Sequence, residues 1–202
     1  MDSLHKLEEI FAHFPGIGPR QARRFVYYLL NKSPSYIGEV IRLIEEVKKS
    51  TSECIQCRRF FIQGIMSTTC PVCSDSNRDT TTLMIVARDS DFETIEKSGA
   101  YRGYYFILGG TIPVLDKEPE KRIRLEKLLN HITDATDLKE IILSLNTTPD
   151  GEHTGNVVKE AIQKLPHASH VKITILGRGL STGAELEYVD GETLRNALKN
   201  RQ

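Results

Sequence analysis

Four cysteines are the residues of this sequence whose type and spacing most directly suggest chemistry. Cys54 and Cys57 form one pair, Cys70 and Cys73 form another, and twelve residues separate the pairs. Two pairs of this kind supply the four thiolates that tetrahedral Zn²⁺ prefers. Because four thiolates leave no open position for a catalytic water, we expect a structural zinc ion. Two disulfides are the alternative, although disulfides are rare where thiols stay reduced.

A glycine turn followed by arginines is the second pattern that suggests chemistry, in the stretch FPGIGPRQARRF. Gly16 and Gly18 allow close approach to the backbone, and Ile17 can fill the space between two helices. The N–H groups that begin the second helix favour an anion such as phosphate, which Arg20 and Arg24 can flank. This arrangement is typical of a helix-hairpin-helix element that holds a nucleic-acid backbone. The alternative is an ordinary helix connection with solvated arginines.

Short helices must position this turn. Ser3 is expected to cap the first helix, Pro19 suits the first position of the second, and a third helical pattern follows Pro34. The second helix is expected to bury one stripe. That stripe consists of Ala22, Phe25, Val26, Leu29 and Leu30. The helical periodicity therefore predicts an all-helical domain over residues 1–52.

The pattern changes after the helices. Residues 53–80 lack periodicity, which indicates a small module held by its cysteines. Four β-rich runs follow, LMIVA, YYFIL, EIILSL and VKITIL, with helical patterns between them. Strands that alternate with helices predict a mostly parallel sheet covered on both faces. Near the end of the chain, Asp190 is expected to cap a last helix. The fold class predicted is therefore α+β with several domains.

Composition narrows the function classes. The chain has 202 residues, 27% of them charged, with a formal net charge of zero, so a contact with a polyanion must come from local clusters of charge. No apolar run is long enough to span a membrane, and acidic residues interrupt the early apolar positions. We therefore expect a cytoplasmic protein without membrane contact. No nucleophilic hydrolase motif is present.

Four segments in a fixed order resemble the bacterial RecR recombination mediators. They are FPGIGPRQARRF, the four cysteines ending in CPVCSDSNRD, LMIVARDSDFETIEKSGAYRGYYFILGG and GRGLSTGAELEYVDGETLRNAL. The resemblance covers nearly the whole chain. It implies a helix-hairpin-helix DNA-binding domain over residues 1–52 and a four-cysteine zinc finger over 53–80. A Toprim-like α/β domain over 81–176 and an oligomerisation arm over 177–202, exchanged between subunits, would follow.

The resemblance also implies partners. Members of this family form a tetrameric ring that can encircle DNA, and work with RecO, and often RecF, to load recombinase at single-stranded gaps. The implied protein would bind single-stranded and duplex DNA without sequence preference, at the nucleoid, and its DNA-contacting basic residues would be Arg20 and Arg24. Two departures stand out. The loop between the cysteine pairs is longer than usual, and TIPVLDKEPEKR replaces a glycine-rich loop after ILGG.

The Toprim resemblance raises the question of catalysis. Active Toprim domains hold Mg²⁺ with a glutamate after the first strand and an Asp-x-Asp pair after a later one. The matching positions here are Ala87, Asn146 and Thr148. We therefore expect no catalytic residues, and we expect Asp150 and Glu152 to form an acidic surface for a partner, which the resemblance suggests is RecO.

Several alternatives remain at this stage. Asp89, Asp91 and Glu93 could rebuild an acidic cluster with Asp150 and Glu152, which would make the chain a magnesium-dependent nuclease or primase. A zinc-containing adaptor that binds only protein is a further alternative. The stretch GRGLSTG could wrap a phosphate, but a nucleotide-binding lysine is missing, and a flexible crossover to a neighbouring subunit is the other interpretation.

Overall fold

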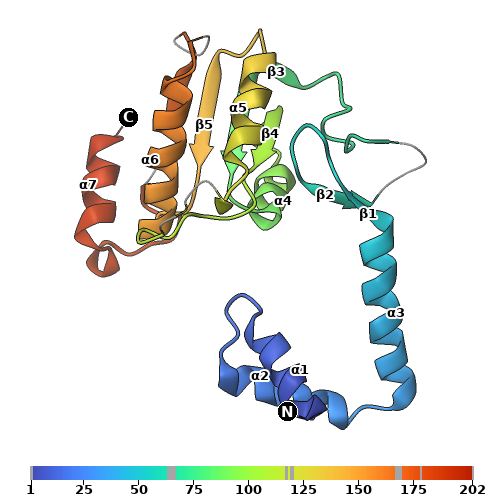
Figure 1. Ribbon diagram of the computed structural model, residues 1–202. Helices are drawn as coiled ribbons and strands as arrows, with labels where there is room; N and C mark the ends of the chain where they lie inside the picture. Colours follow the sequence, from blue (N-terminus) through green and yellow to red (C-terminus); the bar gives the residue numbers. More distant parts are fainter. Residues whose placement is uncertain are drawn as a thin grey trace. The chain divides into compact units, whose positions relative to one another are not determined.

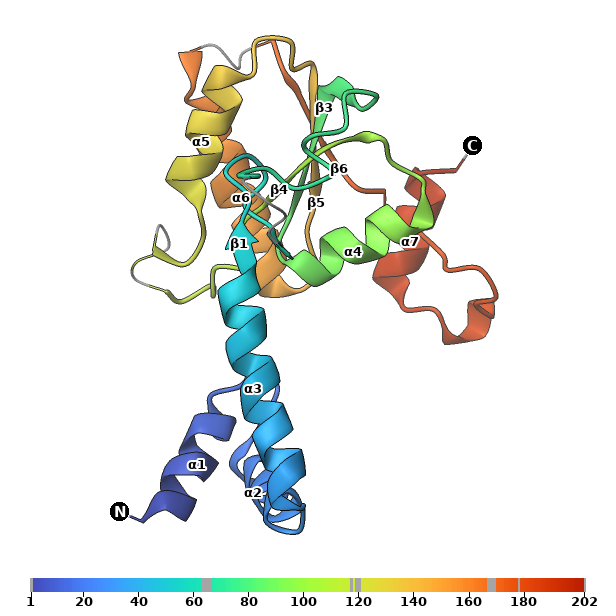
Figure 2. The same ribbon diagram turned by 90° about the vertical axis from the view of Figure 1, so that its right-hand side faces the viewer.

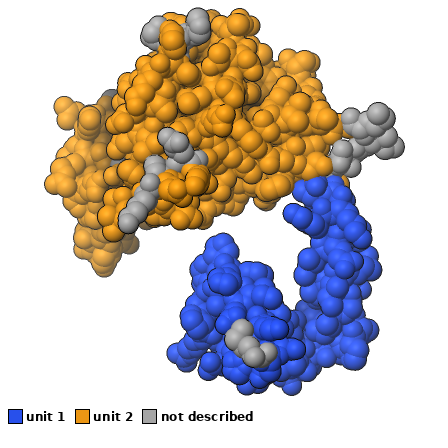
Figure 3. All heavy atoms as spheres, in the orientation of Figure 1, with its two compact units in different colours: residues 1–51 blue, residues 52–202 orange. Residues whose placement is uncertain are grey.

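The computed structural model describes residues 2–62, 67–116, 118, 121–166, 170–177 and 179–201. The chain divides into two compact units, residues 1–51 and residues 52–202 (Figure 3). Unit 1 is helical, and unit 2 combines a cysteine module, a sheet and its covering helices. This organisation confirms the predicted α+β class with several parts.

Unit 1 consists of α1 (Ser3–Ala12), α2 (Pro19–Leu30) and α3 (Pro34–Ser50). The cap of α1 was predicted wrongly, because Ser3 is already helical and Asp2 caps the helix. The Asp2 carboxylate accepts a hydrogen bond from the His5 N–H at 2.9 Å. A carboxylate one residue earlier reaches this free N–H and also places negative charge at the positive end of the helix dipole.

The α1–α2 pair buries less than its apolar pattern predicts. Ala22 and Val26 of the expected stripe are buried, whereas Phe25 and Leu30 are 37% and 63% exposed. Aromatic rings contribute to the contact between the helices, since the Phe11 and Phe25 ring centroids lie 6.1 Å apart at a T-shaped angle. Helical spacing therefore indicates which face is apolar, but not how much of that face finds a partner inside this small unit.

The sheet of unit 2 has four parallel strands in the order β4-β3-β5-β6. Figure 1 labels three of them, β3, β4 and β5. Each predicted β-rich run forms one of them. They are β3 (Asp79–Val86), β4 (Gly103–Ile107), β5 (Glu140–Ser144) and β6 (Lys172–Ile175). The helices between them are α4 (Asp89–Ser98), α5 (Leu125–Asp134) and α6 (Pro149–Gln163). The prediction of a mostly parallel sheet is confirmed.

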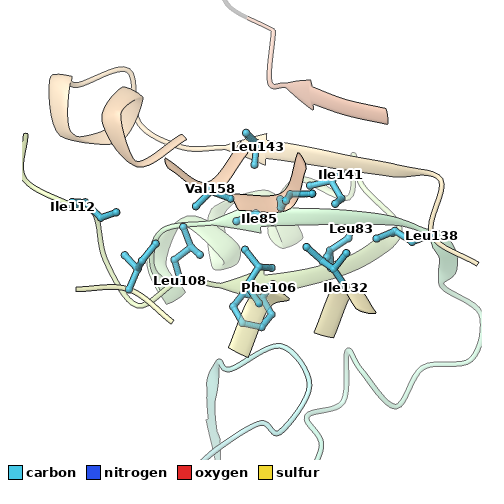
Figure 4. Packing of buried hydrophobic residues seen from close by; sticks show 13 residues of the cluster. Leu83, Ile85, Phe106, Leu108, Ile112, Ile132, Leu138, Ile141, Leu143 and Val158 are labelled. Atoms are coloured by element: carbon cyan, nitrogen blue, oxygen red, sulfur yellow. The ribbon is translucent and has the colours of Figure 1, made fainter. Parts of the chain in front are cut away.

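Alternating residues of the central strand β3 face two separate hydrophobic clusters. Leu83 and Ile85 pack with α5 and α6 in one cluster (Figure 4), and Met84 and Val86 pack with α4 and the cysteines in the other. Figure 2 shows α5 and α6 on one side of the strands and α4 on the other. A parallel sheet needs such cover on both faces, because successive side chains point in opposite directions.

The two ends of unit 2 have little structure of their own. At its start, β1 (Thr51–Glu53) pairs with β2 (Phe60–Ile62). At its end, a short 3₁₀ turn, η3 (Leu186–Tyr188), leads to α7 (Gly191–Lys199), which Asp190 caps as predicted. Large apolar side chains near the C-terminus are exposed, including Leu186 at 67% and Tyr188 at 80%.

Candidate functional site

The turn between α1 and α2 contains two glycines that differ in backbone conformation. Gly16 has a φ of +74°, a left-handed conformation that favours glycine. Gly18 has an ordinary extended backbone and is the N-cap of α2, yet a β-carbon added there would meet no atom within 4 Å. Neither backbone conformation nor packing against this chain therefore requires a glycine at position 18.

Main-chain donors are exposed at this turn. Gly18 offers no side chain to cap α2, and Pro19 occupies its first position. Ile17 donates its N–H to the Phe14 carbonyl at 3.0 Å and is half-buried, as expected of a residue between two helices. Among the described residues, no hydrogen-bond partner is found for the N–H groups of Gly18 and Arg20. The start of α2 can therefore accept an anion.

The three arginines of α2 differ in what they contact. Arg23 forms an ion pair with Glu8, with 3.4 Å between Nε and the carboxylate. Arg24 makes only a long hydrogen bond of 3.4 Å to Gln21. Arg20 is exposed and has no ion pair with another described residue. Arg20 and Arg24 are thus available for a phosphate, whereas Arg23 is already paired.

The four cysteines predicted to bind metal lie together in unit 2. Cys54, Cys57 and Cys70 are buried and Cys73 is half-buried, and their sulfur atoms all lie within 4.8 Å of one another. The Cys57 and Cys70 sulfurs are 3.6 Å apart, and all four cysteines are free, so the disulfide alternative is wrong. Sulfur ligands of a tetrahedral zinc ion lie about 3.8 Å apart, given a Zn–S bond of about 2.3 Å. The cluster fits zinc binding.

The ionisation of the thiols supports the same conclusion. Hydrogen bonds from Cys57, Cys70 and Cys73 hold the pKa of the Cys54 thiol well below its usual range, whereas contact with the other three raises the pKa of Cys73. Contact with Cys54 opposes ionisation of Cys70, but hydrogen bonds with Cys57 and Cys73 outweigh it and lower the pKa of the Cys70 thiol to about 6, whereas contact with Cys54 and Cys70 raises the pKa of Cys57. Two thiolates are therefore favoured in this cluster, and ionisation of the other two thiols is opposed by the negative charge already present. A divalent cation at the centre removes that conflict, because its charge outweighs the repulsion.

Several contacts attach the cysteine module to the sheet domain. The Ile107 N–H of β4 donates to the Cys57 carbonyl at 2.8 Å, and the Arg59 guanidinium lies 4.2 Å from the Phe92 ring centroid of α4. Asp89, which we considered as a possible magnesium ligand, instead accepts a hydrogen bond from the Phe60 N–H at 2.9 Å. This role could not be predicted from the sequence, because the two residues are far apart along the chain.

Arg58 is a further residue that the sequence analysis missed. It follows Cys57 and has a φ of +66°, the only non-glycine residue of the described chain in this conformation. Its N–H donates to the Cys54 carbonyl at 3.0 Å, which closes the turn that brings the first two sulfurs together. Its guanidinium lies 3.7 Å from the Glu53 carboxylate. The position directly after a Cys-x-x-Cys pair was the available signal.

The positions where active Toprim domains carry acids have other functions here. Ala87 is fully buried directly after β3. Thr148 caps α6, and its hydroxyl accepts a hydrogen bond from the Gly151 N–H at 3.2 Å. Asn146 closely approaches Gly151, where an added β-carbon would lie 2.1 Å from the Asn146 carbonyl oxygen. This end of β5 is therefore shaped to begin a helix.

The remaining acidic residues do not converge. Asp150 accepts a hydrogen bond from the Val114 N–H at 3.1 Å, and Asp91 accepts one from the Arg88 N–H at 3.0 Å. Glu152 is exposed on the first turn of α6. Over the part of the chain that the structure describes, the four cysteines are the one group of metal-ligating side chains within ligand distance of each other. The alternative of a rebuilt acidic cluster is therefore wrong for the described residues.

Two other sequence features can be placed. Gly177, Gly179 and Gly183 are exposed, with Gly183 at a φ of +86°, and Arg178, which follows Gly177, lies outside the described residues.

Among the described helices, none has both the length and the apolar character needed to cross a membrane.

Comparison with known proteins places these features in a family. Residues 81–177 match the Toprim domain, and residues 179–202 match the C-terminal part of RecR. A "Recombination protein RecR" of Cereibacter sphaeroides (strain ATCC 17029 / ATH 2.4.9) is 32% identical over 98% of this chain and 96% of its own length. That of Bifidobacterium adolescentis is 34% identical over 99% of this chain and 96% of its own length.

These relatives are named for recombination and not for a catalysed reaction, and they align with the helical unit, the cysteine module and the sheet domain together. The chain therefore belongs to the RecR family of recombination proteins.

Proposed function

We propose that this chain is a non-enzymatic DNA-binding protein that acts as a recombination mediator. The observation that carries the proposal is the combination at Gly18, where neither a left-handed backbone nor packing demands a glycine and the adjacent helix N-terminus is exposed. A close ligand does explain it, because a β-carbon would stand between the ligand and the main-chain N–H groups. Gly16 sets the turn, Ile17 packs beneath it, and Arg20 and Arg24 supply charge for a phosphate.

Such a grip contacts phosphates and not base edges, so binding is independent of sequence. One chain neutralises few phosphates, and its affinity is therefore weak and strongly dependent on salt. Several copies on one particle raise the effective concentration for later contacts by about 100- to 10,000-fold. We propose a closed homotetramer around DNA, supported by the exposed apolar residues of the C-terminal arm, Leu186, Tyr188 and Leu198.

The proposed partners follow from the family. Recombination proteins act at chromosomal DNA, and we propose that this one works there with RecO, and with RecF where present, to load recombinase at single-stranded gaps. Glu152 is our proposed centre of the RecO contact, because it is an exposed carboxylate on the first turn of α6. Asp150 lies two residues earlier on α6 and accepts a hydrogen bond from the Val114 N–H, so its proposed part is to fix the loop next to that surface.

We propose that the metal is zinc and that its function is structural. Four sulfur ligands leave no position for water or substrate, and three of the four cysteines belong to a hydrophobic cluster with Met84 and Tyr105 of the sheet. The zinc ion, when bound, would hold this cluster together. It would take no part in a reaction.

The test compares DNA affinity for the wild type and for the Arg20→Ala/Arg24→Ala variant. A fluorescent oligonucleotide and a matched duplex would be titrated at several salt concentrations. We expect the variant to bind both at least about tenfold more weakly at low salt, with a reduced salt slope. Arg42→Ala/Lys49→Ala is the matched control, since it removes the same charge from α3, and it should bind like the wild type.

Unchanged DNA binding by Arg20→Ala/Arg24→Ala would overturn the proposal in favour of a protein-binding adaptor. Magnesium-dependent nicking or synthesis by the wild type, lost in Asp150→Ala, would establish an enzyme instead. Analytical ultracentrifugation of each variant reports the subunit number and keeps effects on assembly separate from effects on the contact.

A further inference from the structure

The surface of α2 continues beyond the glycine turn in a way that a phosphate grip does not explain. An open groove runs along this helix, and its lining includes Arg20, Arg23, Arg24, Tyr27, Tyr28 and Asn31. Residues three or four apart share a helix face, so arginines at the start and tyrosines further along form one continuous strip. The groove therefore combines positive charge with aromatic rings.

Tyr27 is the more available of the two rings. Its side chain is 52% exposed, and no stacked ring or cation contacts it among the described residues. The Asn31 amide donates a hydrogen bond to the Tyr27 carbonyl at 2.8 Å. This bond helps to hold the Tyr27 backbone in the helix. A tyrosine on a regular helix offers a large flat surface and loses little conformational freedom on binding.

Tyr28 is already engaged by a cation. The Lys32 ammonium lies 4.3 Å from the Tyr28 ring centroid and 5.7 Å from that of Tyr36. This contact covers part of the Tyr28 ring, which is still 51% exposed, and adds positive charge at the far end of the groove. Tyr28 is therefore a secondary surface beside Tyr27.

The charges around the groove favour a polyanion. Among the residues that the structure describes, the groove lining includes three arginines and no carboxylate, and Glu8 is the acid paired with one of them, Arg23, at 3.4 Å. Arg20 and Tyr27 are seven residues apart, which corresponds to about 10 Å along a helix axis. A phosphate at the turn and a flat group over Tyr27 can thus belong to one short segment of a nucleic-acid strand.

The tyrosine rings of the groove can distinguish an unpaired strand from a duplex. In a duplex, base faces are stacked on their neighbours and are not accessible to a side chain, whereas an unpaired strand exposes them. We propose that Tyr27, with Tyr28 beside it, is a stacking surface for unpaired bases of single-stranded DNA. This inference rests on the proposed phosphate contact at the turn. It adds a preference for single strands that the phosphate contact alone does not supply.

The test measures affinity for a thirty-residue thymidine oligonucleotide and for a duplex of the same length, at one salt concentration. Tyr27→Ala should weaken single-strand binding by about 5- to 50-fold and duplex binding by less than about threefold. Tyr28→Ala should also weaken single-strand binding more than duplex binding, but by a smaller factor than Tyr27→Ala. Tyr27→Phe keeps the ring, should bind like the wild type and is the matched control.

Fluorescence gives a second readout. The chain has no tryptophan, so tyrosine emission can be followed directly. Stacking of a base on Tyr27 should quench part of the emission when the oligonucleotide is added, and this part should be missing in Tyr27→Phe. Circular dichroism of each variant checks that the helices are intact.

Three outcomes would overturn the inference. They are equal losses on single strand and duplex, no loss on either, and an altered particle mass in Tyr27→Ala, which would assign the groove to a second copy of this chain. The Arg20→Ala/Arg24→Ala variant distinguishes the two proposals. If it binds both DNA forms normally, the phosphate contact fails, whereas if it loses both while Tyr27→Ala loses neither, only the stacking surface fails.

Discussion

The two units of this chain are built in opposite ways. Unit 2 buries two clusters on the faces of one parallel sheet, whereas in the described part of unit 1 only Ala22 and Val26 are fully buried. Unit 1 also leaves large apolar residues of α3 uncovered, with Ile44 at 64% and Val47 at 60% exposed. A unit of this size gains little from its own core. Unit 2 therefore supplies most of the buried core of the chain, whereas unit 1 leaves apolar side chains exposed where another molecule can contact them.

Loss of the metal should give the largest difference between the units. Cys57→Ser, or removal of zinc by a chelator, should cost unit 2 more than about 3 kcal/mol, because the ligands are part of one of its hydrophobic clusters. Urea unfolding and zinc content of the purified protein measure this effect. Hydrogen exchange in α1 and α2 should stay unchanged.

Ser76→Ala, an exposed change within the cysteine module, is the control for this experiment and should retain zinc and stability. An unfolding free energy that stays the same after complete zinc removal would contradict the structural assignment of the metal.

A pair of identical substitutions compares the cores of the two units. Ile85→Ala removes a fully buried side chain of β3 and should lower the free energy of unfolding by about 2–5 kcal/mol. Ile44→Ala changes an exposed residue of α3 and should cost less than about 0.5 kcal/mol at low protein concentration. Chemical denaturation of both variants at several concentrations measures the difference.

A cost for Ile44→Ala that grows with protein concentration would sharpen the comparison, because it would show that another copy covers α3. A cost equal to that of Ile85→Ala at every concentration would break it.

Substitution of one glycine in each unit should have a smaller effect on stability, and the two variants should differ in which property they lose. Gly151→Ala places a β-carbon 2.1 Å from the Asn146 carbonyl oxygen, and should cost about 1–3 kcal/mol as α6 shifts. Gly18→Ala meets no atom within 4 Å, so it should cost no more than about 1 kcal/mol for the poorer N-cap residue, but it should weaken DNA binding. Thermal unfolding and DNA titration of both variants test this, and a Gly18→Ala variant as destabilised as Gly151→Ala but with normal DNA affinity would contradict it.

The smallest expected effect is a pH dependence of the tyrosines. Burial raises the pKa of Tyr101 in unit 2 to about 12, whereas a hydrogen bond with Lys32 lowers the pKa of Tyr28 in unit 1. Tyr101 ionises near pH 10 when unfolded, so its contribution to stability is complete below pH 10 and is lost as the pH rises through about 12.

Absorbance titration of tyrosinate in the wild type, Tyr101→Phe and Lys32→Gln separates the two groups. Lys32→Gln should shift the early transition to higher pH, and Tyr101→Phe should reduce the amplitude of the late one, to which Tyr105 also contributes because burial raises its pKa. A single transition at the ordinary tyrosine pKa in all three proteins would contradict both assignments.

Much of unit 2 could be predicted because its signals are local. The alternation of Leu83, Met84, Ile85 and Val86, all apolar, indicates a strand buried on both faces, and the two cysteine pairs indicate a metal site. The role of Asp89 could not be predicted, since its partner Phe60 precedes it by 29 residues in the chain. The cap of α1 was misplaced by one residue because Asp2 and Ser3 are both good capping residues.

The sequence by itself determined the types of the main elements and the spacing of the two cysteine pairs, and it places no acid at Ala87, Asn146 or Thr148, because each of these depends on residue type and short spacing. Only the tertiary structure decided which apolar faces are covered, that Asp150 holds the Val114 loop, and that Tyr27 shares a groove with the arginines. The physical reason is that burial and surface shape arise from contacts between distant segments. A periodic pattern fixes which side of a helix is apolar, but not what lies against it.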